Sequence, residues 1–172
     1  TGQGERALHT IWSCHQLPQG LPLHRLRPAC GDHVQQAFQG ERVRKYMMAD
    51  PVTVPAGISI QEFVEDYILK HHYKMFPVVD AAGRLSGCAT LNRVKEVPKA
   101  EWPRRPVAEL SRDCSPENTI SADEQVLDAL GRMSRANSSR LIVVDGDRLA
   151  GMITLKDIMR VLSIKADLEE GS

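Results

Sequence analysis

Apolar residues recur along this chain with two alternating periods, one typical of helices and the other typical of strands. Two segments place apolar residues three and four positions apart, which is the pattern of a helix that buries one face. These residues are Ile60, Phe63, Val64, Tyr67 and Ile68 in the first segment and Val126, Ala129, Leu130 and Met133 in the second. Ser59 and Glu62 have the spacing of a capping box at the start of the first helix. The pattern therefore predicts two amphipathic helices.

Short apolar runs that are nearly continuous predict buried strands. Strands are expected at residues 75–80, 84–89, 141–145 and 148–153, short extended pieces at 52–54 and 119–120, and further helices at 91–97 and 155–166. Gly146 and Asp147 form a two-residue hairpin signal between the last two strands. The elements fall into two sets with the same order, β-α-β-β-α.

The two sets are copies of one unit. Residues 76–91 and 141–155 align with a single gap at the turn, and Val-Val-Asp, Arg-Leu, Gly and Thr-Leu recur in both. The step from Arg84 to Arg148 equals the step from Thr90 to Thr154. One unit alone is too small to cover its own sheet. We therefore expect an α+β fold in which two repeats pack face to face with pseudo-twofold symmetry around a cleft.

The rest of the chain is divided around these repeats. Residues 1–42 are expected to form an irregular or partly disordered arm with a short helix at 32–39, because prolines interrupt much of this segment. The remaining divisions are residues 43–98 for the first repeat, 99–106 for a proline-rich linker, 107–166 for the second repeat and 167–172 for a C-terminal tail.

Charge and cysteine content argue against several classes of protein. Lys plus Arg and Asp plus Glu each number 22, so the chain lacks the basic excess typical of nucleic-acid-binding proteins. No apolar run reaches the roughly 18 residues that a membrane-spanning helix needs, and no signal peptide is visible. None of the 4 cysteines stands in a C-x-x-C pair. We expect reduced thiols in a cytoplasmic protein rather than a disulfide scaffold.

The order of elements, the strand at 76–80 and the segment 151–157 resemble tandem CBS domains, the arrangement called a Bateman module. The resemblance covers residues 43–163. More narrowly, the segments 64–69 and 97–103 are similar to those of CBS pairs appended to site-2-protease-like membrane metalloproteases. The chain has neither membrane helices nor the H-E-x-x-H zinc motif of such a protease. The resemblance implies a regulatory module that is not an enzyme, either in the cytoplasm or as the cytoplasmic part of a membrane protein.

The second repeat carries the sharpest candidate site, Gly151-x-x-Thr154-x-x-Asp157. A strand ends and a helix begins there, so a phosphate placed at this point would accept from free backbone N–H groups and from the Thr154 hydroxyl. Asp157, one turn further on, would be an acceptor for both hydroxyls of a ribose. The resemblance implies that these positions bind an adenosine nucleotide. The alternative is structural, because Thr-x-x-Asp is also the spacing of a capping box.

The first repeat departs from this pattern. It keeps Thr90 but has Arg93 where the family has its ribose-binding acid, which removes the acceptor and breaks the capping box. Arg93 either pairs with a phosphate or faces solvent. The residues that the resemblance places around the base are Thr119, Ile120, Arg140, Leu141 and Ile142, and most of them equally suit a core. We therefore expect one ligand half-site, on the second repeat.

Three functional hypotheses follow. The first is a sensor that binds AMP, ADP, ATP or S-adenosylmethionine and controls a partner domain. It has no covalently bound cofactor, no metal and no catalytic residue. The second is a ligand-free homodimerisation scaffold. The third is the regulatory tail of a membrane metalloprotease, for which the protease domain is the partner.

Overall fold

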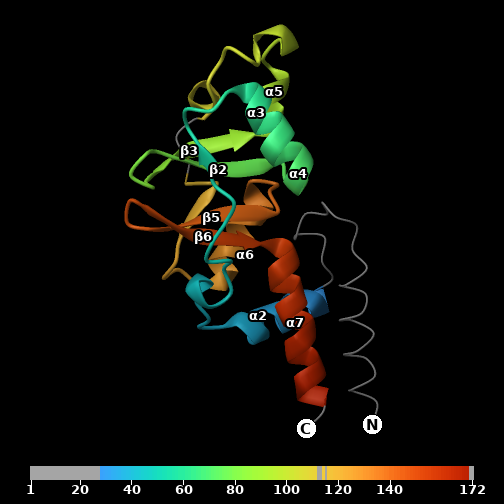
Figure 1. The fold of residues 1–172 in the computed structure, drawn as a ribbon. Coiled ribbons are helices and arrows are strands. Elements are labelled where there is room, and N and C mark those ends of the chain that lie inside the picture. Colours follow the sequence, from blue (N-terminus) through green and yellow to red (C-terminus); the bar gives the residue numbers. More distant parts are fainter. Residues whose placement is uncertain (1–27, 112–113, 115, 171–172) are drawn as a thin grey trace.

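Each repeat folds around a three-stranded sheet with helices on one face (Figure 1). The computed structural model describes residues 28–111, 114 and 116–170. In the first repeat the elements are β1 (Val54–Pro55), α3 (Ile60–Glu62), η3 (Phe63–Ile68), α4 (Leu69–His71), β2 (Met75–Val79), β3 (Leu85–Thr90) and α5 (Leu91–Lys95). The second repeat has β4 (Thr119–Ser121), α6 (Val126–Arg135), β5 (Arg140–Asp145), β6 (Arg148–Thr154) and α7 (Leu155–Glu170).

The two sheets have the same topology. In each, the short first strand runs parallel to the middle strand, and the third strand is antiparallel to the middle one. Both hairpins also shift register near their turns, after Val78 and after Val143. The predicted α+β fold of two β-α-β-β-α repeats is therefore confirmed. Strand and helix ends differ from the predicted ones by a few residues at most.

Among the described residues, four further helices lie before or between the sheet-forming parts of the two repeats. These are α2 (Pro28–Phe38), η2 (Val43–Lys45), η4 (Lys99–Glu101) and η5 (Val107–Glu109). The helix expected at 32–39 is confirmed by α2, which packs against α6 and α7. The irregular arm expected before it lies mostly outside the described residues.

The two sheets are buried on both faces because they pack against each other. On β5, Leu141 and Val143 point into the core of the second repeat, whereas Ile142 points the other way. Ile142 joins Met152 from β6 and Met75 and Cys88 from the first sheet in a separate buried cluster. This inter-sheet cluster explains why the strands are apolar without alternation.

The segments that lead into each repeat pack on the opposite repeat. We define the first lead-in as residues 41–48 and the second lead-in as residues 105–111. Val43 N–H donates to the Glu124 carbonyl at 2.9 Å, and Val107 N–H donates to the Ile58 carbonyl at 2.8 Å. Val43 is buried in the core of the second repeat, and Val107 in that of the first. This exchange follows the same pseudo-twofold symmetry as the sheets. Because each core contains a residue from the lead-in of the other repeat, neither repeat completes its core alone.

Gly151 is the point where the first lead-in crosses β6. Met48 and Met152 exchange both backbone hydrogen bonds, at 2.8 and 3.0 Å. A Cβ atom on Gly151 would lie 2.3 Å from the Met48 carbonyl oxygen and 3.1 Å from the Met47 sulfur. The absence of a side chain at Gly151 is therefore what allows this backbone to approach β6.

Gly151→Ala is expected to lower the free energy of unfolding by about 1–3 kcal/mol, because the lead-in must move off β6. Gly131→Ala in α6 is the matched control, since its new Cβ meets only the mobile Arg135 guanidinium, at 3.4 Å. This control should be neutral or stabilising by up to about 1 kcal/mol. Denaturant unfolding of both variants measures the difference, and equal midpoints would contradict this role of Gly151.

The capping box predicted at the start of the first helix is formed. Ser59 N–H and hydroxyl donate to Glu62 Oε2 at 2.8 and 2.9 Å, and Glu62 N–H donates to the Ser59 hydroxyl at 3.2 Å. The hydrogen bonds from the Ser59 backbone and hydroxyl hold the pKa of Glu62 below its ordinary value. The charged carboxylate is thus the form that stabilises the helix.

This lowered pKa predicts a pH dependence of stability. Because the pKa of Glu62 is lower in the folded than in the unfolded chain, its stabilisation is complete above the unfolded pKa and is lost as the pH falls through the folded one. Glu62→Gln should destabilise the protein at about pH 7, by an amount that shrinks toward about pH 3. Asp66→Asn, an exposed position on the same helix, is the control. Denaturant midpoints at the two pH values test this, and a pH-independent deficit would refute it.

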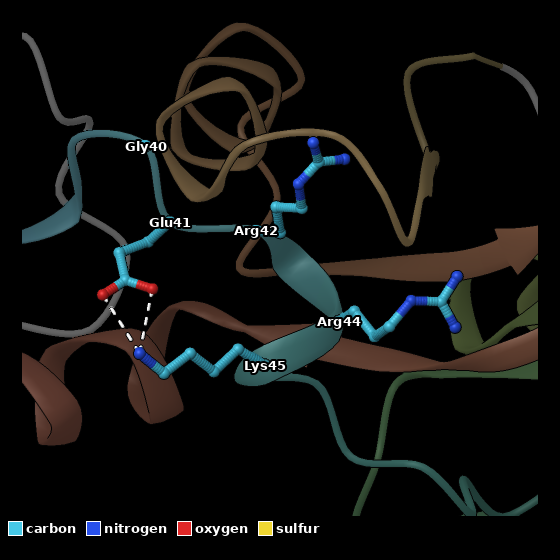
Figure 2. Close-up of a pocket in the computed structure, with 5 residues that line it drawn as sticks. All are labelled: Gly40, Glu41, Arg42, Arg44 and Lys45. Atoms are coloured by element: carbon cyan, nitrogen blue, oxygen red, sulfur yellow. Dashed lines mark hydrogen bonds and ion pairs between the residues drawn. The ribbon is translucent and has the colours of Figure 1, made fainter.

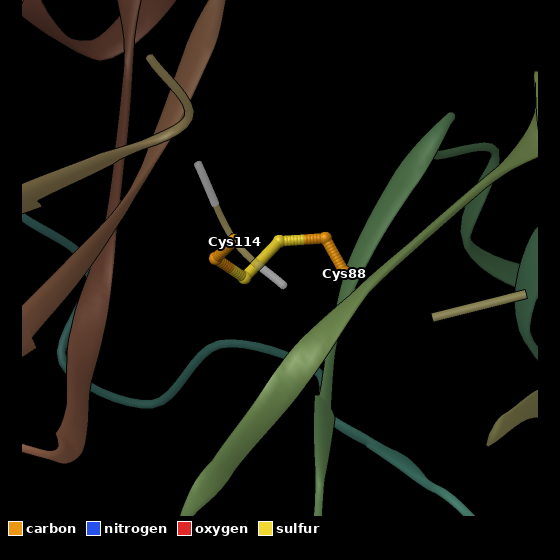
Figure 3. Close-up of a disulfide and its surroundings, with 2 residues drawn as sticks. All are labelled: Cys88 and Cys114. Carbon is orange, nitrogen blue, oxygen red and sulfur yellow. A yellow bond between two sulfur atoms is a disulfide. The ribbon is translucent and has the colours of Figure 1, made fainter. Parts of the chain in front are cut away.

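The expectation of reduced cysteines is wrong for Cys88 and Cys114, which form a disulfide (Figure 3). Cys88 lies on β3, and Cys114 lies in the connection that runs from the second lead-in to β4. Their Cα atoms are 5.7 Å apart, although they are separated by 26 positions in sequence. The pairing depends on where this connection crosses the inter-sheet cluster. Local spacing carries no signal for that path. The corresponding expectation for Cys14 and Cys30 concerns side chains outside the described part of the chain.

Candidate ligand site

The predicted half-site on the second repeat is assembled at the junction of β6 and α7. The Thr154 hydroxyl accepts from Asp157 N–H at 3.1 Å and donates to Asp157 Oδ2 at 2.6 Å. Arg160 Nη1 lies 3.5 Å from Asp157 Oδ1. The structural alternative for this motif, a helix cap, is thus formed. Both groups remain partly exposed, so a ligand that reaches them competes with this cap.

Arg140 joins the half-site and links it to the first repeat. It is the strand partner of Thr154 across the β5–β6 pair. Its guanidinium lies 5.4 Å from the centre of the Tyr73 ring, which belongs to the loop between α4 and β2. Tyr73 is 37% exposed and stacks on His71, with ring centres 5.9 Å apart. Sequence reasoning missed Tyr73, because a loop residue has no period that would assign it to a site.

The residues predicted around the base have two different placements. Ile120 and Leu141 are buried in the core of the second repeat, and Ile142 is buried in the inter-sheet cluster. Thr119 is half-buried and is the strand partner of Ile142. Its carbonyl accepts from Arg132 Nη1 at 2.7 Å. Thr119 and Arg140 thus lie at the end of the sheet where β4 and β5 begin, and the three apolar residues are buried beside them.

The first repeat holds its corresponding residues differently. The Thr90 hydroxyl accepts from Arg93 N–H at 3.4 Å, so a one-sided helix cap persists without the acid. The return hydrogen bond of a capping box has no carboxylate to make it. Arg93 Nη1 instead pairs with Glu96 Oε2 at 2.9 Å. The arginine is therefore engaged along its own helix, and the two repeats are not equivalent.

A larger hollow, of about 380 Å³, lies away from these residues, beside the first lead-in (Figure 2). It is lined by Gly40, Glu41, Arg42, Arg44 and Lys45. Lys45 Nζ donates to both carboxylate oxygens of Glu41, and with Lys165 it holds the pKa of Glu41 below its ordinary value. A smaller hollow lies between α2 and α7. None of the predicted ligand-binding residues lines either of these two hollows.

Within the described ranges, no helix has both the length and the apolar composition needed to cross a bilayer. Among the same residues, no group of three or more His, Cys, Asp or Glu side chains is placed to hold a metal ion.

Comparison with known proteins identifies the family. The model of the CBS domain matches residues 43–99 and 101–164. The chain therefore belongs to the CBS-domain family, as a tandem pair.

Several relatives are zinc metalloproteases by name. Zinc metalloprotease MJ0392 of Methanocaldococcus jannaschii is 33% identical over 139 residues, which cover 80% of this chain and 37% of that protein. Rip3 of Mycobacterium tuberculosis, also named as a zinc metalloprotease, is 28% identical over 131 residues, covering 76% of this chain and 33% of that protein. The chain thus spans about a third of the length of these relatives.

One structurally similar protein has been solved with bound ligands. The CBS domain pair of protein MJ0100, in complex with 5′-methylthioadenosine and S-adenosyl-L-methionine, is 28% identical and superposes with a TM-score of 0.58. The match covers 72% of this chain and 97% of that one. The pair of repeats described here is therefore similar to one that holds adenosine compounds.

Proposed function

We propose that this chain is a regulatory module that senses an adenosine-containing ligand at the half-site formed by Thr154, Asp157 and Arg140. The observation that carries the proposal has two parts. Thr154 and Asp157 bond to each other at one strand–helix junction. Arg140, the strand partner of Thr154, lies over the ring of Tyr73 of the other repeat. The similarity to the MJ0100 pair, which binds two adenosine compounds, supports the ligand class.

Each polar group has a role suited to such a ligand. The Asp157 carboxylate is an acceptor for the two ribose hydroxyls, and the Thr154 hydroxyl and nearby backbone N–H groups are donors to a phosphate or carboxylate. The Arg140 guanidinium supplies a charge for the same group. Thr90 and Arg93 on the first repeat contribute at most a phosphate contact, because no carboxylate accompanies them.

The contact with Tyr73 gives the ligand a way to act on a partner. A ligand bound at this junction replaces contacts within the second repeat and also meets the first. If the two repeats exchange between two arrangements, the ligand shifts that equilibrium only as far as it binds one arrangement more tightly than the other. The inter-sheet cluster, which both repeats share, is the element whose packing would change.

The regulated partner is proposed to be the protease domain of a larger membrane protein. The support is the similarity to named zinc metalloproteases, of which this chain matches about a third of the length. In that protein the pair would lie on the cytoplasmic side. The upstream coding sequence tests this directly: membrane helices together with an H-E-x-x-H motif would confirm it.

The ligand hypothesis predicts that S-adenosylmethionine, AMP, ADP or ATP at about millimolar concentration raises the melting temperature. Asp157→Asn should weaken binding by about tenfold or more, measured by calorimetry, because hydrogen bonds to a carboxylate are lost. Arg93→Ala is the matched control, which should leave binding of the phosphate-free S-adenosylmethionine unchanged. If none of the four compounds shifts the melting temperature, the sensor function is rejected.

A change in ligand affinity must be distinguished from a change in the stability of the helix cap, because Asp157 takes part in both. Losing a cap costs about 1 kcal/mol, so unfolding of Asp157→Asn without ligand is measured first. Thr154→Ser keeps a hydroxyl for both roles and should bind like the parent chain. If a variant is as stable as the parent chain but binds the ligand more weakly, the lost affinity comes from a lost ligand contact and not from the helix cap.

A homodimer of two CBS pairs is a second proposal, supported by exposed apolar residues on two helices. Leu69 on α4 is 63% exposed and Ile164 on α7 is 52% exposed. Light scattering of the full chain should give the mass of two chains, and Leu69→Glu with Ile164→Glu should reduce it to one. A monomeric parent chain would contradict the proposal.

A further inference from the structure

We propose that Cys88 and Cys114 form a reversible thiol–disulfide switch that sets the ligand affinity of the half-site on the second repeat. This inference rests on the proposed ligand-sensing function and adds a redox control to the same site. Cys88 lies on a strand of the first repeat, and Cys114 lies in the connection to the second.

The disulfide is part of the contact between the two sheets (Figure 3). Cys88 is 7% exposed and belongs to the inter-sheet cluster with Ile142 and Met152. Cys114 is partly buried against the same cluster. Ile142 is also the strand partner of Thr119, one of the residues predicted to meet the ligand base. The disulfide thus packs against β5, and Thr119 lies on the neighbouring strand β4.

The connection that carries Cys114 is anchored on both sides of the disulfide. Before it, Leu110 is buried in the core of the first repeat. After it, Arg132 Nη1 donates to the carbonyls of Pro116 and Thr119, at 3.4 and 2.7 Å, and Arg132 also pairs with Glu124. The disulfide therefore fixes the approach to β4, at the edge of the sheet where Thr119 lies.

The chemistry is thiol–disulfide exchange with a dithiol reductant. A thiolate of the dithiol attacks one sulfur of the pair and the Cys88–Cys114 bond breaks. The second thiol then closes the dithiol into a cyclic disulfide. Two electrons and two protons pass to the protein, giving two thiols. Cys114 is the accessible partner because its side chain is partly exposed. Reduced Cys88 remains a small buried side chain, so the fold is retained.

Reversibility follows from the location proposed for the module. In a reducing cytoplasm a disulfide is typically transient and redox-sensing rather than a permanent crosslink. When the bond opens, the approach to β4 loses one of its anchors, and the binding-competent arrangement is populated less. The dissociation constant rises in proportion to that lost population. Oxidation is therefore the state of higher affinity.

The experiment uses the full chain with Cys14→Ser and Cys30→Ser, so that every redox signal comes from Cys88 and Cys114. Alkylation and mass spectrometry establish that the pair is closed after treatment with a small disulfide and open after treatment with a dithiol. Calorimetry with S-adenosylmethionine is then expected to give a dissociation constant about three- to tenfold higher for the reduced form. Re-oxidation should restore the original value.

Cys114→Ser supplies the matched control. This variant cannot close the disulfide, so it should bind S-adenosylmethionine like the reduced form and should not respond to the dithiol. Cys88→Ala serves the same purpose with an apolar replacement for the buried side chain.

The outcomes separate the switch from the sensor function. Equal affinity in the oxidised and reduced states overturns the switch and leaves the sensor function standing. Failure of the pair to close under oxidant also overturns it. Absence of binding in both states rejects the sensor function, and the switch with it.

Discussion

The packing of the two sheets against each other is the contact on which the rest of this structure depends. A three-stranded sheet covered by helices on one face leaves its other face exposed, and here each sheet covers the other through Met75, Cys88, Ile142 and Met152. The exchange of lead-in segments reinforces this arrangement, because each repeat completes its core with residues that belong to the approach of the other. The repeats are therefore one cooperative unit. A change at their contact reaches both cores.

Much of the fold is predictable from sequence because it is local. Helical periodicity found the first helix of each repeat, and the Ser59–Glu62 box marked where one begins. The replacement of the acid by Arg93 predicted an asymmetric module, and the ion pair of Arg93 with Glu96 is consistent with it. These features depend on residues at most a few positions apart.

The features that sequence reasoning missed all join distant segments. The sequence motif assigns Gly151 to a phosphate site, yet its immediate role is to let the Met48 backbone cross β6. The Cys88–Cys114 bond and the Arg140–Tyr73 contact likewise depend on the path of a connection or a loop. No periodicity encodes such a path. Among the residues predicted around the base, the sequence does not separate the buried ones from the half-buried ones, because most of them suit a core.

The candidate site consists of groups that already have partners. Thr154 and Asp157 bond to each other, and Arg140 lies over Tyr73. A ligand must replace these contacts, so its net affinity is the difference between two sets of hydrogen bonds. In the proposed function, a ligand that displaces Arg140 from Tyr73 also changes a contact between the two repeats.

Hydrogen–deuterium exchange of the full chain, with and without S-adenosylmethionine, measures the response of both repeats in one experiment. With the compound we expect slower exchange at residues 153–157 together with a change at residues 73–75, and no change at residues 90–93. Protection confined to residues 90–93, or exchange that is identical with and without the compound, would contradict a single half-site on the second repeat that is coupled to the first.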